Sequence, residues 1–529
     1  MTEERLFHPL EDRTAKSRSR VSGDKVVRIR TEHSNWSFFK TLLTSCLVLL
    51  QLGIILSLNF LFAWGLKWYL VFLAVISLVT AVSVLSSHRA AQAKAVWVLF
   101  ILVFFVFGFV VYFMSNDRFM YRRARKRHKK IFAKTESYVK PYVEPVNASD
   151  DVRLTCRYLY NSGGFIPCKN TAVKYFPSGS SLFDDALERI EKAEDFVFIE
   201  YFAIADGVLL NRFWNVLERK LKEGVKVRII YDDVGSRVIS IKTRRKIREA
   251  GAEIRVFNRL LSRFTFALNY RDHRKIIVVD GKTAYTGGMN LADEYVNEKR
   301  MYGYWKDAGM RMDGESVDAM TMIFLRQWEY ITGDEEDYSQ YLYKYIPYDN
   351  LSTVVPYADG PEYELSIGKS VYENVISSAK RRLYIMTPYF IPDDSIAQAL
   401  TNKALEGVDV RLILPSVPDK YYVYLLTRDN AERLLKYGVK VYYLKDAFVH
   451  SKLILSDDCA VVGSINFDLR SFYQQFENAV LCNDENFLEE VAADFEQTFK
   501  DSDNVVKPRK NGVLKSIAIS LLRLVSPLM

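Results

Sequence analysis

Cysteine and histidine are scarce in this chain, whose 529 residues include five cysteines and six histidines. The cysteines are odd in number and lack CxxC spacing, so neither a disulfide framework nor a zinc-type cluster is indicated. Cys156 and Cys168 could in principle pair, but a cytoplasmic location would keep them reduced. We therefore expect a protein that works without a metal or another cofactor.

We also expect no cleavable secretion signal, because the first apolar run begins about forty residues into the chain and no cleavage context stands out. Residues 1–35 form a polar tail, and residues 36–115 contain apolar runs near 42–66, 68–86 and 95–114. The first and third runs are long enough to cross a bilayer, and the second is marginal but nearly free of charge. No soluble domain surrounds them, so we predict N-terminal transmembrane helices and a multi-pass protein of the cell membrane.

Acidic residues are absent from the strongly basic stretch that follows. Arg118–Lys134 contains nine Lys or Arg and no acid. A basic run is usually a solvated face or a nucleic-acid patch. Directly after an apolar span it is better interpreted as a cytoplasmic juxtamembrane segment, which also attracts anionic lipid. We assign residues 116–150 to this basic linker and expect no nucleic-acid partner.

The orientation of the N-terminus stays open. With three spans and a cytoplasmic linker it lies outside, but residues 1–35 carry eight Lys or Arg against six acids and give little signal of their own. If one apolar segment is re-entrant, the N-terminus lies inside.

What the chain does contain is one polar motif written twice. A histidine is followed by a lysine two residues later and by an aspartate five residues after that, in His273, Lys275 and Asp280, and again in His450, Lys452 and Asp457. Each copy continues through an apolar run and an acidic turn to small residues and an asparagine, Asn290 or Asn466. A lone histidine is more often a core residue, but that explanation does not account for a repeat with similar flanks.

The spacing indicates how each copy works. A histidine and a lysine two residues apart on a strand share one face. Asp280 and Asp457 have the opposite parity, so we interpret them as turn or support residues that anchor the half-site. Asn290 and Asn466 follow small residues, which let the backbone approach a ligand closely. Two histidines, two lysines and two asparagines can thus converge on one anion.

The repeat extends beyond the motif. Three pairs of apolar runs parallel each other, 196–204 with 383–391, 224–231 with 407–414, and 251–257 with 438–444. Stretches with helical periodicity lie between them, which predicts βαβ units, a largely parallel sheet and the α/β class. We predict two such domains, packed about a pseudo-twofold axis that brings His273 and His450 to a shared cleft. Their expected bounds are 151–335 and 353–505, with a linker at 336–352 and an amphipathic tail at 506–529.

These motifs resemble the phospholipase D superfamily and, within it, the bacterial cardiolipin synthases. The resemblance runs from about residue 66 to the C-terminus. It implies two phospholipase D-like domains and catalysis without a metal. One departure is visible, because six residues separate Asp280 from Gly287 but only five separate Asp457 from Gly463.

A mechanism follows from paired sites of this kind. One neutral histidine attacks phosphorus to form a phosphohistidine, and the other donates a proton to the departing alcohol. In the family the N-terminal histidine is usually the nucleophile, which implies that role for His273 and the acid/base role for His450. The lysines and asparagines of both motifs stabilise the charge on phosphate.

Each histidine also needs an orienting carboxylate on its other ring nitrogen. In related enzymes an acid just before a following strand does this, which implies Asp307 and Glu477. The alternative is that both are solvated acids at strand ends.

The resemblance implies that two phosphatidylglycerols react to give cardiolipin and glycerol. A membrane-tethered phosphodiesterase, either lipase or nuclease, would keep the same residues, and a non-catalytic lipid-binding scaffold is a third class. We expect phosphatidylglycerol, other anionic phospholipids and the membrane as partners. The tail from Val513 to Leu528 resembles an interfacial helix, with a short packing helix as the alternative.

Overall fold

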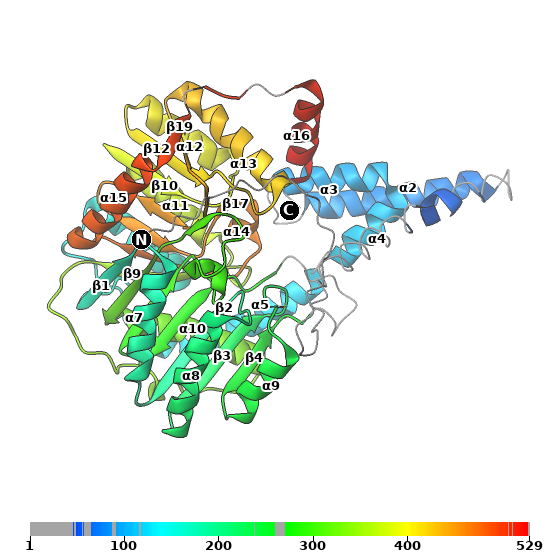
Figure 1. The fold of residues 1–529 in the computed structure, drawn as a ribbon. Coiled ribbons are helices and arrows are strands. Elements are labelled where there is room, and N and C mark those ends of the chain that lie inside the picture. The colour runs from blue at the N-terminus through cyan, green and yellow to red at the C-terminus, as the bar shows by residue number, and fades with distance from the viewer. Residues whose placement is uncertain are drawn as a thin grey trace, which may run out of the picture. The chain divides into compact units, whose positions relative to one another are not determined.

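The two repeated segments fold as two α/β halves with the same sheet topology (Figure 1). The computed structural model describes residues 46, 49–54, 57, 65–86, 91–115, 118–236, 238–259, 270–505, 507–509 and 512–526. Residues 74–529 form one compact unit, and residues 1–73 form another.

The first half is built on a seven-stranded sheet. Its strands in spatial order are β1 (Thr171–Phe176), β8 (Gly309–Gly314), β6 (Thr283–Gly287), β5 (Lys275–Val279), β2 (Phe196–Tyr201), β3 (Lys226–Asp232) and β4 (Glu253–Phe257). Strands β2, β3 and β4 are parallel and are joined through α8 (Val208–Lys222) and α9 (Ile241–Glu249), whereas the other pairings are antiparallel. The α/β class is confirmed, but the sheet is mixed rather than largely parallel, because a tight turn joins β5 directly to β6.

The second half repeats this order and adds one edge strand. Its strands are β9 (Val354–Asp359), β18 (Glu477–Cys482), β16 (Ala460–Gly463), β15 (Leu453–Leu455), β10 (Arg382–Met386), β12 (Asp409–Pro415), β13 (Lys440–Leu444) and β19 (Ser502–Val505). Helices α12 (Asp394–Leu405) and α13 (Tyr421–Leu434) connect its parallel strands. The duplication seen in the sequence is thus a duplication of topology.

Helices cross the sequence boundary between the halves. α10 (Ser316–Thr332) is buried almost all round and contacts both sheets, and its buried residues include Arg326, Gln327 and Glu329. α6 (Asp150–Gly163) packs on α11 (Ile367–Ser378) of the second half, and α15 (Glu485–Lys500) contacts β1 of the first. The domain bounds drawn from the sequence remain predictions, and the packing does not follow them.

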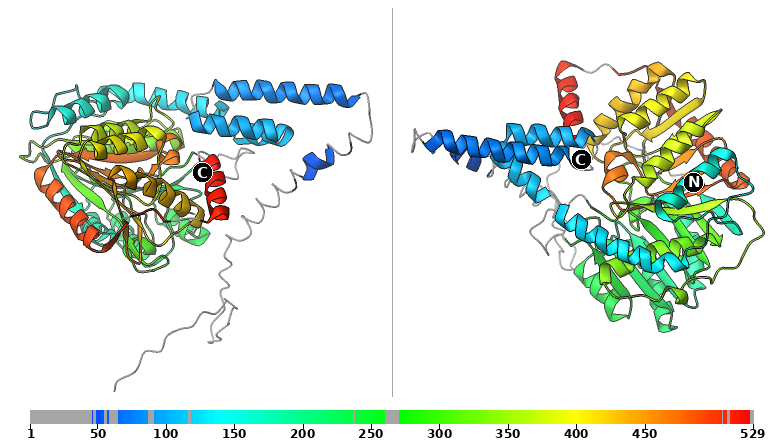
Figure 2. Two further views of the ribbon diagram at one scale, coloured as in Figure 1. Left: turned by 90° about the horizontal axis from the view of Figure 1, so that it is seen from above. Right: turned by 180° about the vertical axis from the view of Figure 1, so that it is seen from behind.

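Most of the basic segment forms the helix α5 (Arg118–Thr135), which packs on α10 (Figure 2). His128 is buried and stacks on Tyr330, with ring centroids 4.0 Å apart. Burial lowers the pKa of His128 to about 3, helped by the neighbouring arginine Arg274. Ile131 is buried on the same side of the helix. The apolar residues between the cations therefore pack α5 into the same compact unit as the two halves.

The apolar N-terminal region agrees with the prediction only in part. α2 (Gly65–Leu85) contains Trp68–Leu85, the one helix among the described residues that is long and apolar enough to cross a membrane. The run near 42–66 lies mostly outside the described residues. Multi-pass topology remains a prediction.

The run near 95–114 is two helices, α3 (Ala91–Val103) and α4 (Phe105–Ser115), rather than one span. They fold back on each other, so that the rings of Trp97 and Tyr112 lie 5.2 Å apart. The two helices approach closely at Gly108 of α4, where a Cβ would lie 2.8 Å from the backbone of Ile101. At 1.5 Å per residue the two helices are about 20 and 16 Å long, and a bilayer core is about 30 Å thick.

Candidate active site

Short parallel strand pairings between the halves position both histidines. β14 (Ala447–Val449) pairs with β7 (Tyr304–Lys306), and the next residue, His450, donates its backbone N–H to Lys306 O at 2.7 Å. The other half repeats the arrangement, since Asp272 bridges to Phe476 and the backbone N–H of His273 donates to Phe476 O at 2.8 Å. The segment that carries each histidine is therefore bonded to the opposite half.

The crossing places each histidine beside an acid of the other half. Nδ1 of His450 lies 2.7 Å from Asp307 Oδ2, and Nδ1 of His273 lies 2.9 Å from Glu477 Oε2. Both acids are fully buried, while both histidines keep 7% of their surface exposed. An acid at Nδ1 favours the tautomer in which Nδ1 carries the proton. Among the described residues none forms a hydrogen bond with Nε2 of either ring, so this nitrogen is free to meet phosphorus or a proton.

The two lysines of the motifs lie beside the histidines and are almost completely buried. Lys275 Nζ donates to His273 O at 2.5 Å, and Lys452 Nζ lies 2.8 Å from His450 Nδ1. Burial lowers the pKa of Lys275 to about 7 and that of Lys452 to about 8, and for Lys275 the charge on Lys452 adds to the effect. Because two buried ammonium groups repel each other, an anion that binds between them stabilises both charges.

The two histidine–acid pairs differ in charge. Burial alone would raise the pKa of Asp307, but His450 and Lys452 outweigh it and hold the pKa below its ordinary value. Burial raises the pKa of Glu477 well above its ordinary value. Burial and the lysine charges lower the pKa of both histidines, to about 3 for His450. An ionised carboxylate therefore stands beside His450, where it favours a transient imidazolium.

The two asparagines are not equivalent either. The carboxamide of Asn290 bonds within its own half, accepting from Ala203 N at 3.1 Å and donating to Tyr295 OH at 2.7 Å. Oδ1 of Asn466 is buried and lacks a partner among the described residues. In Asn290 one amide N–H beyond the bond to Tyr295 is left for a phosphate oxygen.

Asp280 and Asp457 do not touch the histidines. Asp280 accepts the backbone N–H groups of Glu194, Asp195 and Phe196, at 2.8 to 2.9 Å. Asp457 accepts the corresponding three N–H groups before β10, at 2.6 to 3.1 Å. Both aspartates thus tie the turn after the motif strand to the start of the neighbouring strand, which is the anchoring position that their parity indicated.

Several positioning residues escaped the sequence analysis. Ser464 Oγ donates to Glu477 Oε2 at 2.5 Å. The corresponding residue in the first half is Gly288, where an added Cβ would lie 2.2 Å from Asp307 Oδ1. The sequence difference between Gly-Gly in the first motif and Gly-Ser in the second could have shown this. It determines whether the neighbouring acid contacts a hydroxyl, as Glu477 does, or leaves no space for a side chain, as Asp307 does.

Asn478 of the second half forms hydrogen bonds to the first half next to the histidine motif. Its Oδ1 accepts from Lys275 N at 3.1 Å, and its Nδ2 donates to Thr286 Oγ1 at 2.7 Å. This asparagine follows Glu477 and has no counterpart in the motif pattern, so nothing in the sequence alone singled it out. Within the described part of the chain, no group of three His, Cys, Asp or Glu side chains could hold a metal ion.

Two protein families match the chain by sequence. The family described as cardiolipin synthase, PLD-like domain, matches residues 186–306 and 372–499, one segment in each half. The family described as phospholipase D-nuclease N-terminal matches residues 70–115.

Relatives align over most of the chain. An uncharacterized protein of Streptococcus mutans is 35% identical over 452 residues, which cover 82% of this chain and 96% of the relative. Cardiolipin synthase 2 of Bacillus anthracis is 32% identical over 455 residues, covering 84% of this chain and 88% of the relative. The crystal structure of phosphatidylserine synthase from Haemophilus influenzae aligns with 72% of this chain and 98% of its own, at a TM-score of 0.55 and 14% identity, which shows a shared fold.

Proposed function

Since the chain belongs to the cardiolipin synthase family of phospholipase D-like proteins, we propose that it transfers a phosphatidyl group from one phosphatidylglycerol to another, giving cardiolipin and glycerol. The observation that carries the proposal is the crossed pairing of His273 with Glu477 and of His450 with Asp307. It joins two imidazoles and two lysines from opposite halves into one anion site.

In the first step Nε2 of His273 bonds to phosphorus of the first phosphatidylglycerol. The anionic phosphate of the bound substrate and the Asp307 carboxylate favour uptake of a proton by His450 in the complex. The bond from phosphorus to the terminal glycerol oxygen breaks, and the protonated His450 gives that oxygen its proton, so that glycerol leaves. In the second step a headgroup hydroxyl of another phosphatidylglycerol attacks phosphorus and returns its proton to His450. The phosphorus–nitrogen bond breaks, and cardiolipin leaves with both histidines restored.

The difference between the two acids supports this assignment of roles. Asp307, whose pKa is held low, stabilises the imidazolium that His450 must form as an acid. Glu477, whose pKa is raised, leaves His273 a neutral nucleophile. Lys275 and Lys452 stabilise the charge on the nonbridging oxygens in both steps. An anion between the two ammonium groups also reduces their repulsion and raises their pKa values.

We further propose that the protein is a multi-pass membrane protein with its catalytic unit in the cytoplasm. The apolar helix Trp68–Leu85 supports membrane attachment. The basic residues of α5 support the cytoplasmic side. Protease accessibility of the catalytic unit in sealed, oriented vesicles tests this placement.

The reaction is tested with the purified full chain in nanodiscs that contain phosphatidylglycerol labelled in its terminal glycerol and in its acyl chains. We expect labelled glycerol and cardiolipin in equal amounts. Release of phosphatidate with glycerol, in place of cardiolipin, would show a phosphodiesterase that gives the intermediate to water. Failure to release labelled glycerol at all would contradict both activities.

A further inference from the structure

The C-terminal helix α16 (Val513–Val525) has two apolar faces. One face packs on α13, where Ile519 is buried against Leu426 and neighbouring residues. The opposite face carries a stripe at intervals of three and four residues, which is exposed by 85, 53, 61 and 43% at Leu514, Ile517, Leu521 and Leu524. No other element among the described residues covers this stripe.

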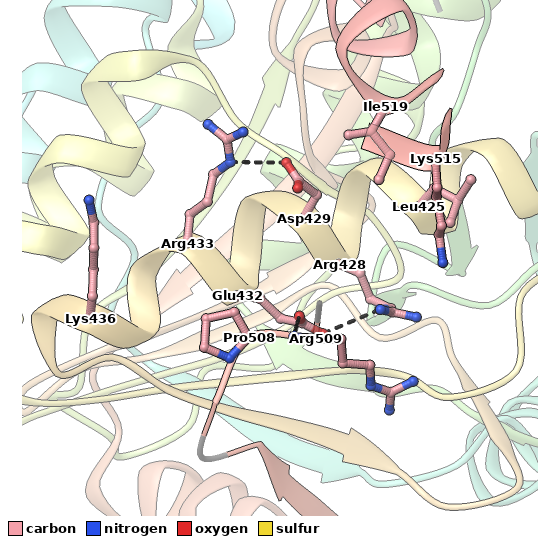
Figure 3. A pocket seen from close by; sticks show the side chains of 10 residues that line it. All are labelled: Leu425, Arg428, Asp429, Glu432, Arg433, Lys436, Pro508, Arg509, Lys515 and Ile519. Atoms are coloured by element: carbon pink, nitrogen blue, oxygen red, sulfur yellow. Dashed lines mark hydrogen bonds and ion pairs between the residues drawn. The ribbon is translucent and has the colours of Figure 1, made fainter. Parts of the chain in front are cut away.

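A basic cavity of about 410 Å³ opens between α13 and α16 (Figure 3). Its lining includes five cations, Arg428, Arg433, Lys436, Arg509 and Lys515. Only two carboxylates, Asp429 and Glu432, share this lining. The cavity therefore carries an excess of positive charge beside the exposed apolar stripe.

The two carboxylates are already occupied. Asp429 pairs with Arg433 at 3.0 Å and also with Arg523 of α16, and Glu432 pairs with Arg428 at 3.2 Å. Glu432 also accepts the backbone N–H of Arg509, at 2.8 Å. No carboxylate of the described residues lies within ion-pair distance of the three remaining cations, Lys436, Arg509 and Lys515. Lys436 lies over the ring of Tyr437 and Arg509 over the ring of Tyr443, and neither neutral ring cancels the positive charge.

We propose that this cavity binds the phosphate of an anionic phospholipid in the bilayer, while the exposed stripe of α16 lies among the acyl chains. A phosphate pairs with Lys and Arg through charge-assisted hydrogen bonds. An amphipathic helix with cations at its polar edge binds at the interface of an anionic membrane. One lipid satisfies both features, because its headgroup and its chains meet at the boundary between the cavity and the stripe.

The site is separate from the catalytic one but mechanically joined to it. None of the residues that line the cavity belongs to a histidine motif. On its other side α13 holds Phe390, whose N–H donates to Thr427 Oγ1 at 3.1 Å. Phe390 begins β11, which pairs with β17 (Phe467–Asp468), the strand that directly follows Asn466. A lipid bound at α16 therefore braces the elements that carry the second half-site.

The test is hydrogen exchange of residues 512–526 in the full chain, with both His273→Ala and His450→Ala present so that the lipid composition does not change. The protein is placed in nanodiscs of phosphatidylcholine, with or without phosphatidylglycerol. We expect exchange in α16 to be about tenfold slower or more when phosphatidylglycerol is present. The triple variant K436Q, R509Q and K515Q should lose this difference. The matched control K169Q, K192Q and K222Q neutralises three exposed lysines outside the cavity and should keep it.

Two further arms decide the source of the anion. Inorganic phosphate added to phosphatidylcholine nanodiscs should not slow the exchange, and an equal slowing would show a site for free phosphate instead of a lipid. Equal protection in both kinds of nanodisc would show an apolar anchor without headgroup recognition and would also overturn the proposal. Because the protein under test is inactive, a failure here says nothing about the proposed reaction.

Discussion

At the scale of single residues, the site is defined by which acid lies beside which histidine. Each pair has one member from each half, and the two acids differ in the direction of their pKa shifts. Two motifs of the same spacing can therefore perform different steps of one reaction.

The first prediction separates the two histidines with a substrate whose leaving group needs no proton, phosphatidyl-p-nitrophenol. His450→Ala should still release one equivalent of nitrophenol, because His273 can attack phosphorus unaided. His273→Ala should release none. Asp307→Asn removes a charge and should resemble the His450→Ala variant, with natural phosphatidylglycerol turnover reduced about 10³-fold or more. Glu477→Gln keeps a neutral side chain beside His273 and should reduce that turnover far less. Rapid-quench absorbance measures the burst of nitrophenol. The reverse pattern would show that His450 is the nucleophile and His273 the acid.

With phosphatidylglycerol itself, near-normal synthesis by either alanine variant would show that the halves do not share a site.

The second prediction concerns pH. Lys275 and Lys452 act as cations, and burial lowers their pKa values to about 7 and about 8. The charged form is thus present below these values and is lost as the pH rises through them. Because kcat/KM reports the free enzyme, it should fall with rising pH across this window. The fall in kcat should come at higher pH, since bound phosphate favours the ammonium form. A flat kcat/KM between about pH 6 and pH 10 would contradict the lowered lysine pKa values.

At the scale of elements, α5 shows how a charged sequence can hide a packing helix. Arg125 donates to Tyr363 O at 2.5 Å, whereas Arg127 donates to Glu329 O at 3.3 Å and lies over the ring of Tyr330. Those partners belong to both halves of the catalytic unit. The same helix also exposes Lys126 and Lys130, so only some of its cations are left to attract lipid.

The third prediction separates the cations of α5 that bond to the protein from those that are exposed. R125Q with R127Q should loosen α5 by on the order of 2 kcal/mol for the bonds to two carbonyls. Limited proteolysis should then cut within 118–135 sooner. K126Q with K130Q is the matched control, and it should leave proteolysis unchanged. It should instead raise the phosphatidylglycerol fraction needed for half-maximal rate and flatten the dependence on ionic strength, because each cation near an anionic surface contributes about 1 kcal/mol. Equal proteolysis of both variants would show that the two kinds of cation do not differ.

The sequence predicted those elements whose pattern is local. The repeated strands, the α/β class and the anchoring position of Asp280 and Asp457 follow from period and parity. The mixed sheet did not follow, because the apolar runs do not show that β5 and β6 form a hairpin. The resemblance implied Asp307 and Glu477 as orienting acids, but their crossing to the opposite half and the role of Asn478 depend on how two distant segments pair and could not be derived. The dense charge of α5 concealed the buried His128.

At the scale of the whole molecule, the chain combines two buried histidine–lysine motifs with an apolar helix, Trp68–Leu85, that is long enough to cross a bilayer. The basic excess of nine charges is compatible with work at an anionic surface. At the histidine motifs the positive charge comes from lysine side chains of the protein.

The fourth prediction follows from this supply of charge. Phosphatidylglycerol turnover in detergent should survive thorough chelation, since the lysines provide the positive charge that a metal ion would otherwise supply. Measuring the rate before and after dialysis against a chelator, with added divalent ions as the control, checks this. A strict requirement for a divalent ion in detergent would count against the proposed chemistry.

The crossed bonds have a consequence for how this repeat can change over generations. Duplication usually leaves one copy free to drift while the other keeps the task. Here the backbone and ring of each histidine are held by the opposite copy. A damaging substitution in either copy therefore also disturbs the position of the histidine in the other copy. Neither copy can replace the other, so selection acts on the two copies as a single inherited unit.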